Sequence, residues 1–105
     1  MFGLSNEIYS KIIEIVKKYN YDFFIFGSRA RGDYKNNSDI DIAIYGQITE
    51  KEEMMIRNDF DMLQIPYTID LVFIIKIEKE ELLKSIKKEG IKLQWTDLVK
   101  KKKIF

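Results

Sequence analysis

The sequence predicts a single α/β (α+β) domain in which a mixed β-sheet is flanked by helices. Segments with helix and strand periodicity follow one another in the order α-β-β-α-β-α-(β) over residues 1–105. There is one proline, no internal repeat and no Gly/Ser-rich linker to mark a domain boundary. The loop between the first two strands is too short for a crossover helix, so these strands are expected to be antiparallel neighbours.

The composition limits the chemistry that the chain can perform. The 18 Lys plus Arg residues nearly balance the 17 Asp plus Glu residues, which argues against a broad basic face for nucleic acid. The chain has no cysteine and no histidine, which excludes a disulfide framework, a thiolate or imidazole metal site and a Ser-His-Asp system. Any metal must therefore be held by oxygen ligands, which favours a hard cation such as magnesium.

Targeting signals are not evident in the sequence. The start of the chain lacks a basic segment followed by a long apolar run, and no apolar stretch approaches the ~20 residues that span a bilayer. A cytoplasmic protein is therefore expected.

The first half of the chain is expected to hold one helix and two strands. Ser5–Tyr19 has helical periodicity, with Ser5 or Asn6 as its cap. The aromatic and β-branched segment Tyr21–Phe26 predicts a buried strand. Gly27–Ser38 predicts a turn and loop, with one helical turn at Arg29–Arg31. Asp39–Tyr45 alternates, which predicts a strand with one face of isoleucines and one acidic face.

The second half is expected to continue as helix, strand, helix and short edge strand. The corresponding segments are Glu50–Gln64, closed by Pro66, then Thr68–Ile75, Glu78–Glu89, ended by Gly90, and Ile91–Trp95. The buried residues expected in the first of these helices are Met54, Met55, Phe60 and Leu63. Lys100–Lys103 is interpreted as a solvated tail.

Three aspartates carry the clearest chemical signal. Asp39 and Asp41 share one face of a strand that is otherwise isoleucine and alanine, although aspartate is disfavoured in strands. Two carboxylates on one face repel each other unless a cation lies between them. Asp70 stands in a second apolar strand, IDLVFI. If the two strands are neighbours, three carboxylates converge and can hold two magnesium ions.

A second signal lies at the end of the first strand. Gly27 allows the backbone to approach an anion closely, and exposed N–H groups with the Ser28 hydroxyl can hold phosphate oxygens. Arg29 and Arg31 follow, with guanidinium groups suited to phosphate or to an acidic partner. A hairpin of the first two strands would bring Gly27-Ser28 to the aspartate pair, as nucleotidyl transfer requires.

Simpler explanations exist for each signal. Gly27-Ser28 could be an ordinary strand-to-loop turn, since such dipeptides are common. Asp39 could be a loop-end cap partnered with Ser38. A buried ion pair between Arg31 and Asp41 could explain that carboxylate without any metal.

The segment Gly27–Ile44 resembles the signature of the DNA polymerase β-like nucleotidyltransferase superfamily. That signature is Gly-Ser, ten residues and then Asp-x-Asp, and here ten residues separate Ser28 from Asp39. GSRARG followed by SDIDIAI is similar to the minimal nucleotidyltransferase (MNT) subfamily. IDLVFI around Asp70 resembles the third carboxylate of that family, and EGIKLQW resembles its usual close.

The resemblance implies a polymerase β-like nucleotidyltransferase fold that uses ATP with magnesium. By this resemblance Asp39, Asp41 and Asp70 would be the metal ligands and catalytic carboxylates, and Gly27 and Ser28 would bind the triphosphate. We also expect Asp70 to act as general base for the acceptor hydroxyl. An acceptor-binding second domain is absent from the 105 residues, so the acceptor site is expected from a partner or from a second copy.

The resemblance also implies a partner. MNT proteins are commonly encoded beside an all-helical HEPN ribonuclease toxin and act as its antitoxin, in characterised cases by adenylylating a tyrosine of the toxin. The alternatives are an antitoxin that neutralises its toxin by binding alone, and an adenylyltransferase acting on a small molecule.

Overall fold

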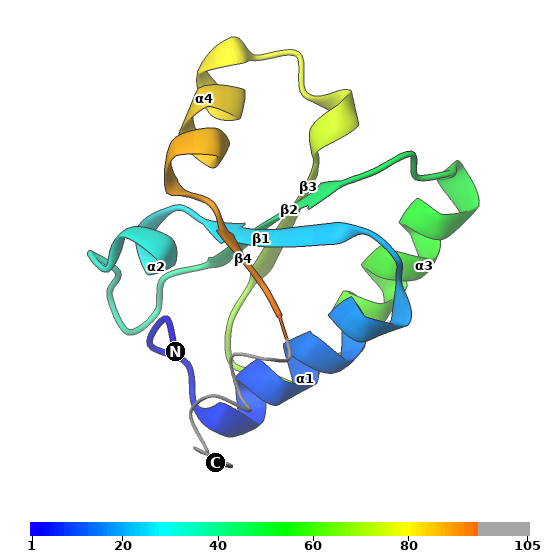
Figure 1. Ribbon diagram of the computed structural model, residues 1–105. Coiled ribbons are helices and arrows are strands. Elements are labelled where there is room, and N and C mark those ends of the chain that lie inside the picture. The colour runs from blue at the N-terminus through cyan, green and yellow to red at the C-terminus, as the bar shows by residue number, and fades with distance from the viewer. Residues whose placement is uncertain (95–105) are drawn as a thin grey trace, which may run out of the picture.

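The computed structural model describes residues 1–94, and the predicted Trp95 strand end and the Lys100–Lys103 tail lie outside them. The order of elements confirms the α/β fold class (Figure 1). The elements are α1 (Asn6–Lys18), β1 (Asp22–Phe26), α2 (Ser28–Arg31), β2 (Ile40–Tyr45), α3 (Glu50–Asp61), β3 (Ile69–Phe73), the 3-10 helix η1 (Ile74–Lys76), α4 (Glu80–Glu89) and β4 (Ile91–Lys92).

The four strands form one mixed sheet in the order β3-β2-β1-β4. Strand β1 is antiparallel to β2 and to β4, whereas β2 and β3 are parallel. The antiparallel β1–β2 pair agrees with the prediction made from its short connection, and β4 is an edge strand as expected. Strand β3 forms the other edge of the sheet in the part of the chain that the structure describes.

The sheet has two unequally covered faces. Figure 1 shows α1 and α3 on one face and α4 on the other. The α1/α3 face carries the larger core, to which β2 contributes its three fully buried isoleucines, Ile40, Ile42 and Ile44. The α4 face carries a smaller buried cluster of Phe26, Ala43 and Ile86. Because successive strand residues point to opposite faces, Asp41 shares the thinly covered α4 face with Ala43.

Helix α1 begins after Ser5, one of the two cap residues expected from the sequence. The Ser5 hydroxyl accepts a hydrogen bond from the Ile8 N–H at 3.2 Å, and Tyr19 is the C-cap. The buried side chains of this helix are Tyr9, Ile12, Ile13 and Ile15, which belong to the larger core.

The expected core residues of α3 are partly wrong. Phe60 is buried as predicted and Leu63 is half-buried, but Met54 is 71% exposed and Met55 is 47% exposed. Ile56 is fully buried instead. Positions 56, 60 and 63 follow the i, i+4, i+7 spacing of one helical stripe, and the methionine pair lies outside that stripe.

Strand β3 is shorter than expected. It ends at Phe73, and the chain turns through η1, which leaves Ile75 52% exposed. Among residues 1–94 there is no helix with the length and apolar character needed to cross a membrane.

Candidate active site

The turn from β1 into α2 places backbone directly against a carboxylate. Gly27 has φ +73°, a conformation that residues with a side chain rarely adopt. A Cβ on Gly27 would lie 2.4 Å from Oδ2 of Asp41, so only glycine fits here. Ser28 is the first residue of α2 and follows this contact immediately. The sequence-predicted Gly27-Ser28 pair is therefore adjacent to the sequence-predicted Asp41.

Strand register brings two of the three aspartates together. Asp41 of β2 pairs with Asp70 of β3 in the parallel ladder and with Phe26 of β1 in the antiparallel ladder. Burial raises the pKa of Asp41, and the charges of Asp70 and Asp39 raise it further, against the opposing charge of Arg31. A hydrogen bond with the Asp70 carboxyl adds to the rise. The carboxyl groups of Asp41 and Asp70 therefore lie side by side on the α4 face.

Asp39 completes the acidic cluster at a greater distance. It is exposed and precedes β2, and it acts on Asp41 through its charge alone. Among residues 1–94, no three acidic side chains are already close enough to form a metal-binding group. The structure thus brings Asp41 and Asp70 into contact and leaves Asp39 beside them.

Arg29 is directed into the protein and not toward the carboxylates. Its side chain is only 2% exposed. The guanidinium donates two hydrogen bonds to the Ser38 carbonyl, at 3.1 and 2.8 Å, and one to the Phe2 carbonyl at 3.0 Å. It also lies against the rings of Tyr34 and Tyr67, with Cζ 5.2 and 4.6 Å from their centroids.

This set of contacts gives Arg29 a role that differs from the predicted triphosphate contact. Its hydrogen bonds go to the main-chain carbonyls of Ser38 and Phe2, and Ser38 directly precedes Asp39. Arg29 therefore fixes the loop that carries Asp39 and holds the N-terminal residues against it. The tyrosines and Phe2 that complete this arrangement were not anticipated, because no motif or periodicity in the sequence marks them.

Arg31 remains at the surface beside the site. Its guanidinium donates to Glu89 at 2.8 Å and to Asp33 at 3.3 Å, and the side chain is 45% exposed. These contacts raise the pKa of Arg31. The alternative of a buried Arg31–Asp41 ion pair is therefore wrong, although the charge of Arg31 still acts on Asp41.

The donor set suits a hard divalent cation. All three acidic side chains offer oxygen ligands, and repulsion among them falls when a cation binds. Because Gly27 has no Cβ, the Asp41 carboxylate can lie directly against the turn. The half-buried Asp41, the exposed Asp70 and the Gly27-Ser28 turn lie together at one end of the sheet, and carboxylates beside such a turn are parts that metal-assisted phosphoryl or nucleotidyl transfer uses.

Comparison with known proteins places this geometry in context. Residues 10–97 match the family described as "Polymerase beta, Nucleotidyltransferase". Comparison with curated protein sequences gives no significant match.

Two solved structures share the fold. A toxin-antitoxin crystallised with AMP-PNP has a TM-score of 0.63 at 22% identity, covering 85% of this chain and 76% of that one. A mutant of the toxin-antitoxin MntA-HpeT, with two Asp-to-Glu replacements, has a TM-score of 0.60 at 19% identity, covering 85% of this chain and 75% of that one.

Proposed function

The chain belongs to the polymerase beta nucleotidyltransferase family, and from this we propose that it transfers AMP from ATP to a protein hydroxyl in a magnesium-dependent reaction. The observation that carries the proposal is the register of Asp41 with Asp70, at the point where a Cβ on Gly27 would meet the Asp41 carboxylate. A half-buried carboxyl group, Asp41, that lies beside a second carboxyl and against a turn that requires glycine is costly for a fold unless a ligand uses it.

The chain's own residues have distinct parts in this step. Asp39, Asp41 and Asp70 would hold up to two Mg²⁺ ions, which when bound supply charge stabilisation for the phosphates and activate the acceptor oxygen. Gly27 and Ser28 would contact the triphosphate. Asp70 is exposed and can accept the proton of the acceptor hydroxyl. The acceptor oxygen bonds to the α-phosphorus, the bond from that phosphorus to the bridging oxygen breaks, and pyrophosphate leaves with the electron pair.

The acceptor that fits best is a tyrosine of a HEPN-type ribonuclease toxin, with this protein acting as the cytoplasmic antitoxin. Two structures with the same fold are toxin-antitoxin complexes, and one of them was crystallised with AMP-PNP. In this proposal a partner protein presents the acceptor hydroxyl to the carboxylates. ATP as donor and tyrosine as acceptor rest on the MNT resemblance.

Toxin rescue together with transfer tests this function. Cells expressing the proposed partner, a HEPN-type toxin, are expected to survive with the wild-type protein and to die with Asp41→Asn, although the variant still binds the toxin. The asparagine is nearly isosteric, so it weakens a divalent site without opening a cavity. Survival with Asp41→Asn equal to that with wild type would show that the antitoxin acts by binding alone.

A further inference from the structure

Among residues 1–94, no strand pairs with the outer edge of β3, which we call its free edge, and this edge offers main-chain hydrogen-bonding groups next to the carboxylates. Ile40 of β2 donates its N–H to the Thr68 carbonyl at 2.9 Å, which sets the phase of the parallel ladder. Because main-chain groups alternate between the two sides of a strand, Asp70 and Val72 bond toward β2. The N–H and C=O groups of Leu71 and Phe73, one and three residues beyond Asp70, are then directed to the free edge.

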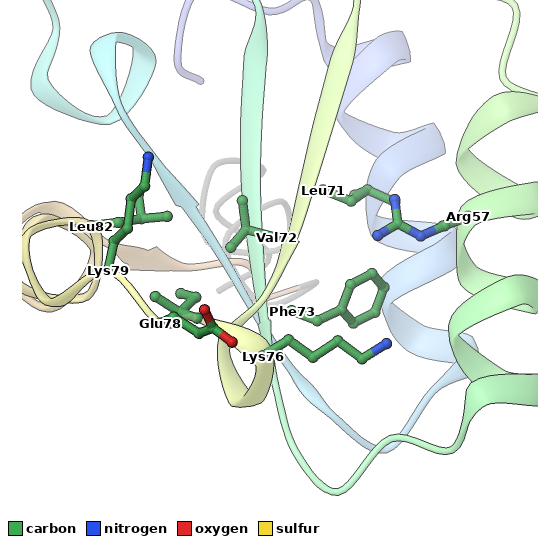
Figure 2. A pocket seen from close by; sticks show the side chains of 9 residues that line it. Arg57, Leu71, Val72, Phe73, Lys76, Glu78, Lys79 and Leu82 are labelled. Carbon is green, nitrogen blue, oxygen red and sulfur yellow. The ribbon is translucent and has the colours of Figure 1, made fainter.

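A groove of about 380 Å³ wraps around this edge. Leu71 and Phe73 pack against the larger core on the α3 side, and Val72 and Leu82 pack against the smaller cluster on the α4 side. All four line the groove. Figure 2 shows Leu71 and Phe73 on one side of β3, and Leu82 on the other. An extended chain added to the edge would therefore find an apolar surface for alternate side chains on each face.

Cationic side chains surround the groove. Arg57, Lys76 and Lys79 line it, against one acidic lining residue, Glu78. Glu53 of α3 forms ion pairs with Lys76 at 2.6 Å and with Arg57 at 3.2 Å, so those two cations are partly neutralised. Counting Glu53, three positive charges face two negative ones, and the excess favours an acidic ligand over a basic one.

We infer that this groove, the β3-edge groove, binds an extended acidic segment of the acceptor protein as an added strand. The inference rests on the proposed transfer function. Main-chain hydrogen bonds to Leu71 and Phe73 supply affinity, and the excess positive charge selects acidic residues. An added strand rises about 3.3 Å per residue. An acceptor side chain one or two residues from the position opposite Leu71 would therefore reach the end of the groove next to Asp70.

The test has two other outcomes, an unoccupied groove and a groove that pairs with a second copy of this chain. Lysines at a sheet edge also protect proteins from edge-to-edge aggregation, in which case nothing binds the groove. A second copy of this chain could pair through the same edge, which would make protection of the edge depend on protein concentration.

Amide hydrogen exchange measured by NMR examines the edge residue by residue. The probe is a random Glu–Tyr copolymer, and a Lys–Tyr copolymer of equal tyrosine content is the control. The Glu–Tyr copolymer is expected to slow exchange at Leu71 and Phe73 about tenfold or more. The Val72 amide, already bonded to β2, is expected to change little. The Lys–Tyr copolymer is expected to protect neither edge amide.

Charge reversal tests the selectivity of the groove. Lys79→Glu is expected to weaken binding of the Glu–Tyr copolymer about tenfold, with the melting temperature unchanged. Lys84→Glu, an exposed α4 position that does not line the groove, is the matched control and is expected to bind as wild type does.

The transfer reaction, run in parallel with α-labelled ATP and magnesium, separates the groove from the proposed function. Label on the copolymer without protection of Leu71 and Phe73 would overturn the groove and leave the transferase standing. Protection without label would support the groove and show that a tyrosine of the bound copolymer is not an acceptor, and the reaction with the toxin then decides the transferase. The absence of both signals would overturn the groove, and protection that grows with protein concentration alone would assign the edge to a second copy.

Discussion

Replacing Arg29 with methionine is expected to destabilise the domain by about 3 kcal/mol. Methionine keeps most of the side-chain length and removes every donor. The Ser38 and Phe2 carbonyls then lose three hydrogen bonds from a charged group, and two aromatic rings lose their cation. With a guanidinium that is 2% exposed, water cannot replace these partners easily.

The magnitude follows from the contacts. Two carbonyls that each lose a charged donor cost about 1.5–3 kcal/mol apiece, and the two ring contacts add about 0.5–1 each. Such terms overlap in one network, and removing a buried charge returns part of its desolvation cost. The estimate of about 3 kcal/mol corresponds to a urea midpoint lower by roughly 2 M for a small domain.

Urea unfolding of Arg29→Met beside Arg57→Met measures the effect. Arg57 also contacts a ring, that of Phe73, and pairs with Glu53, but it is 49% exposed. Its replacement is expected to cost less than about 1 kcal/mol. Equal losses of unfolding free energy in the two variants would refute the structural role of Arg29. A raised KM for ATP with unchanged stability would instead support the triphosphate contact predicted from sequence.

Three further predictions concern other parts of the molecule. Tyr19→Phe is expected to cost about 1 kcal/mol, because the hydroxyl donates to Asp59 at 2.5 Å. Burial, then the hydrogen bond and charge of Asp59, raise the pKa of Tyr19 to about 12. In urea unfolding, the wild-type protein should therefore be more stable than Tyr19→Phe below about pH 10, and this difference in unfolding free energy should vanish as the pH passes about 12. Asp41→Asn is expected to raise the metal-free melting temperature near pH 7. Burial and two neighbouring carboxylates raise the pKa of Asp41, so its ionisation opposes folding. The melting temperature of this variant should also respond less to magnesium with ATP than that of wild type. Ile56→Ala should cost about 2–4 kcal/mol in urea unfolding, whereas Met54→Gln should stay within about 0.5, and similar losses would contradict the observed burial.

Much of the fold follows from local sequence patterns. The order of helices and strands, the antiparallel β1–β2 pair and the edge position of β4 were all predicted, because periodicity and loop length are encoded in neighbouring residues. The side of α3 that is buried was not predicted correctly. Methionine is apolar but tolerates exposure, so only tertiary contacts distinguish the exposed Met54 from the buried Ile56.

The candidate site was predictable where a motif marks it. Gly27 and the aspartates stand at spacings that a hairpin and a neighbouring strand bring together, and the structure places Asp41 beside Asp70. The roles of the two arginines could not be separated in sequence, since both follow the same turn. Arg29 is buried by residues distant in the chain, including Phe2 and Tyr67, and no local pattern reports such contacts.

The most direct measurement is the fate of phosphate label in a transfer reaction with the proposed partner, a HEPN-type toxin. Label from α-phosphate-labelled ATP is expected to join the partner, and label from γ-phosphate-labelled ATP is expected to remain in released pyrophosphate. Asp41→Asn and Asp70→Asn are expected to slow transfer about a thousandfold, a barrier change of about 4 kcal/mol, while remaining folded. Transfer of γ-label, or transfer by both variants at the wild-type rate, would contradict nucleotidyl transfer at this carboxylate pair.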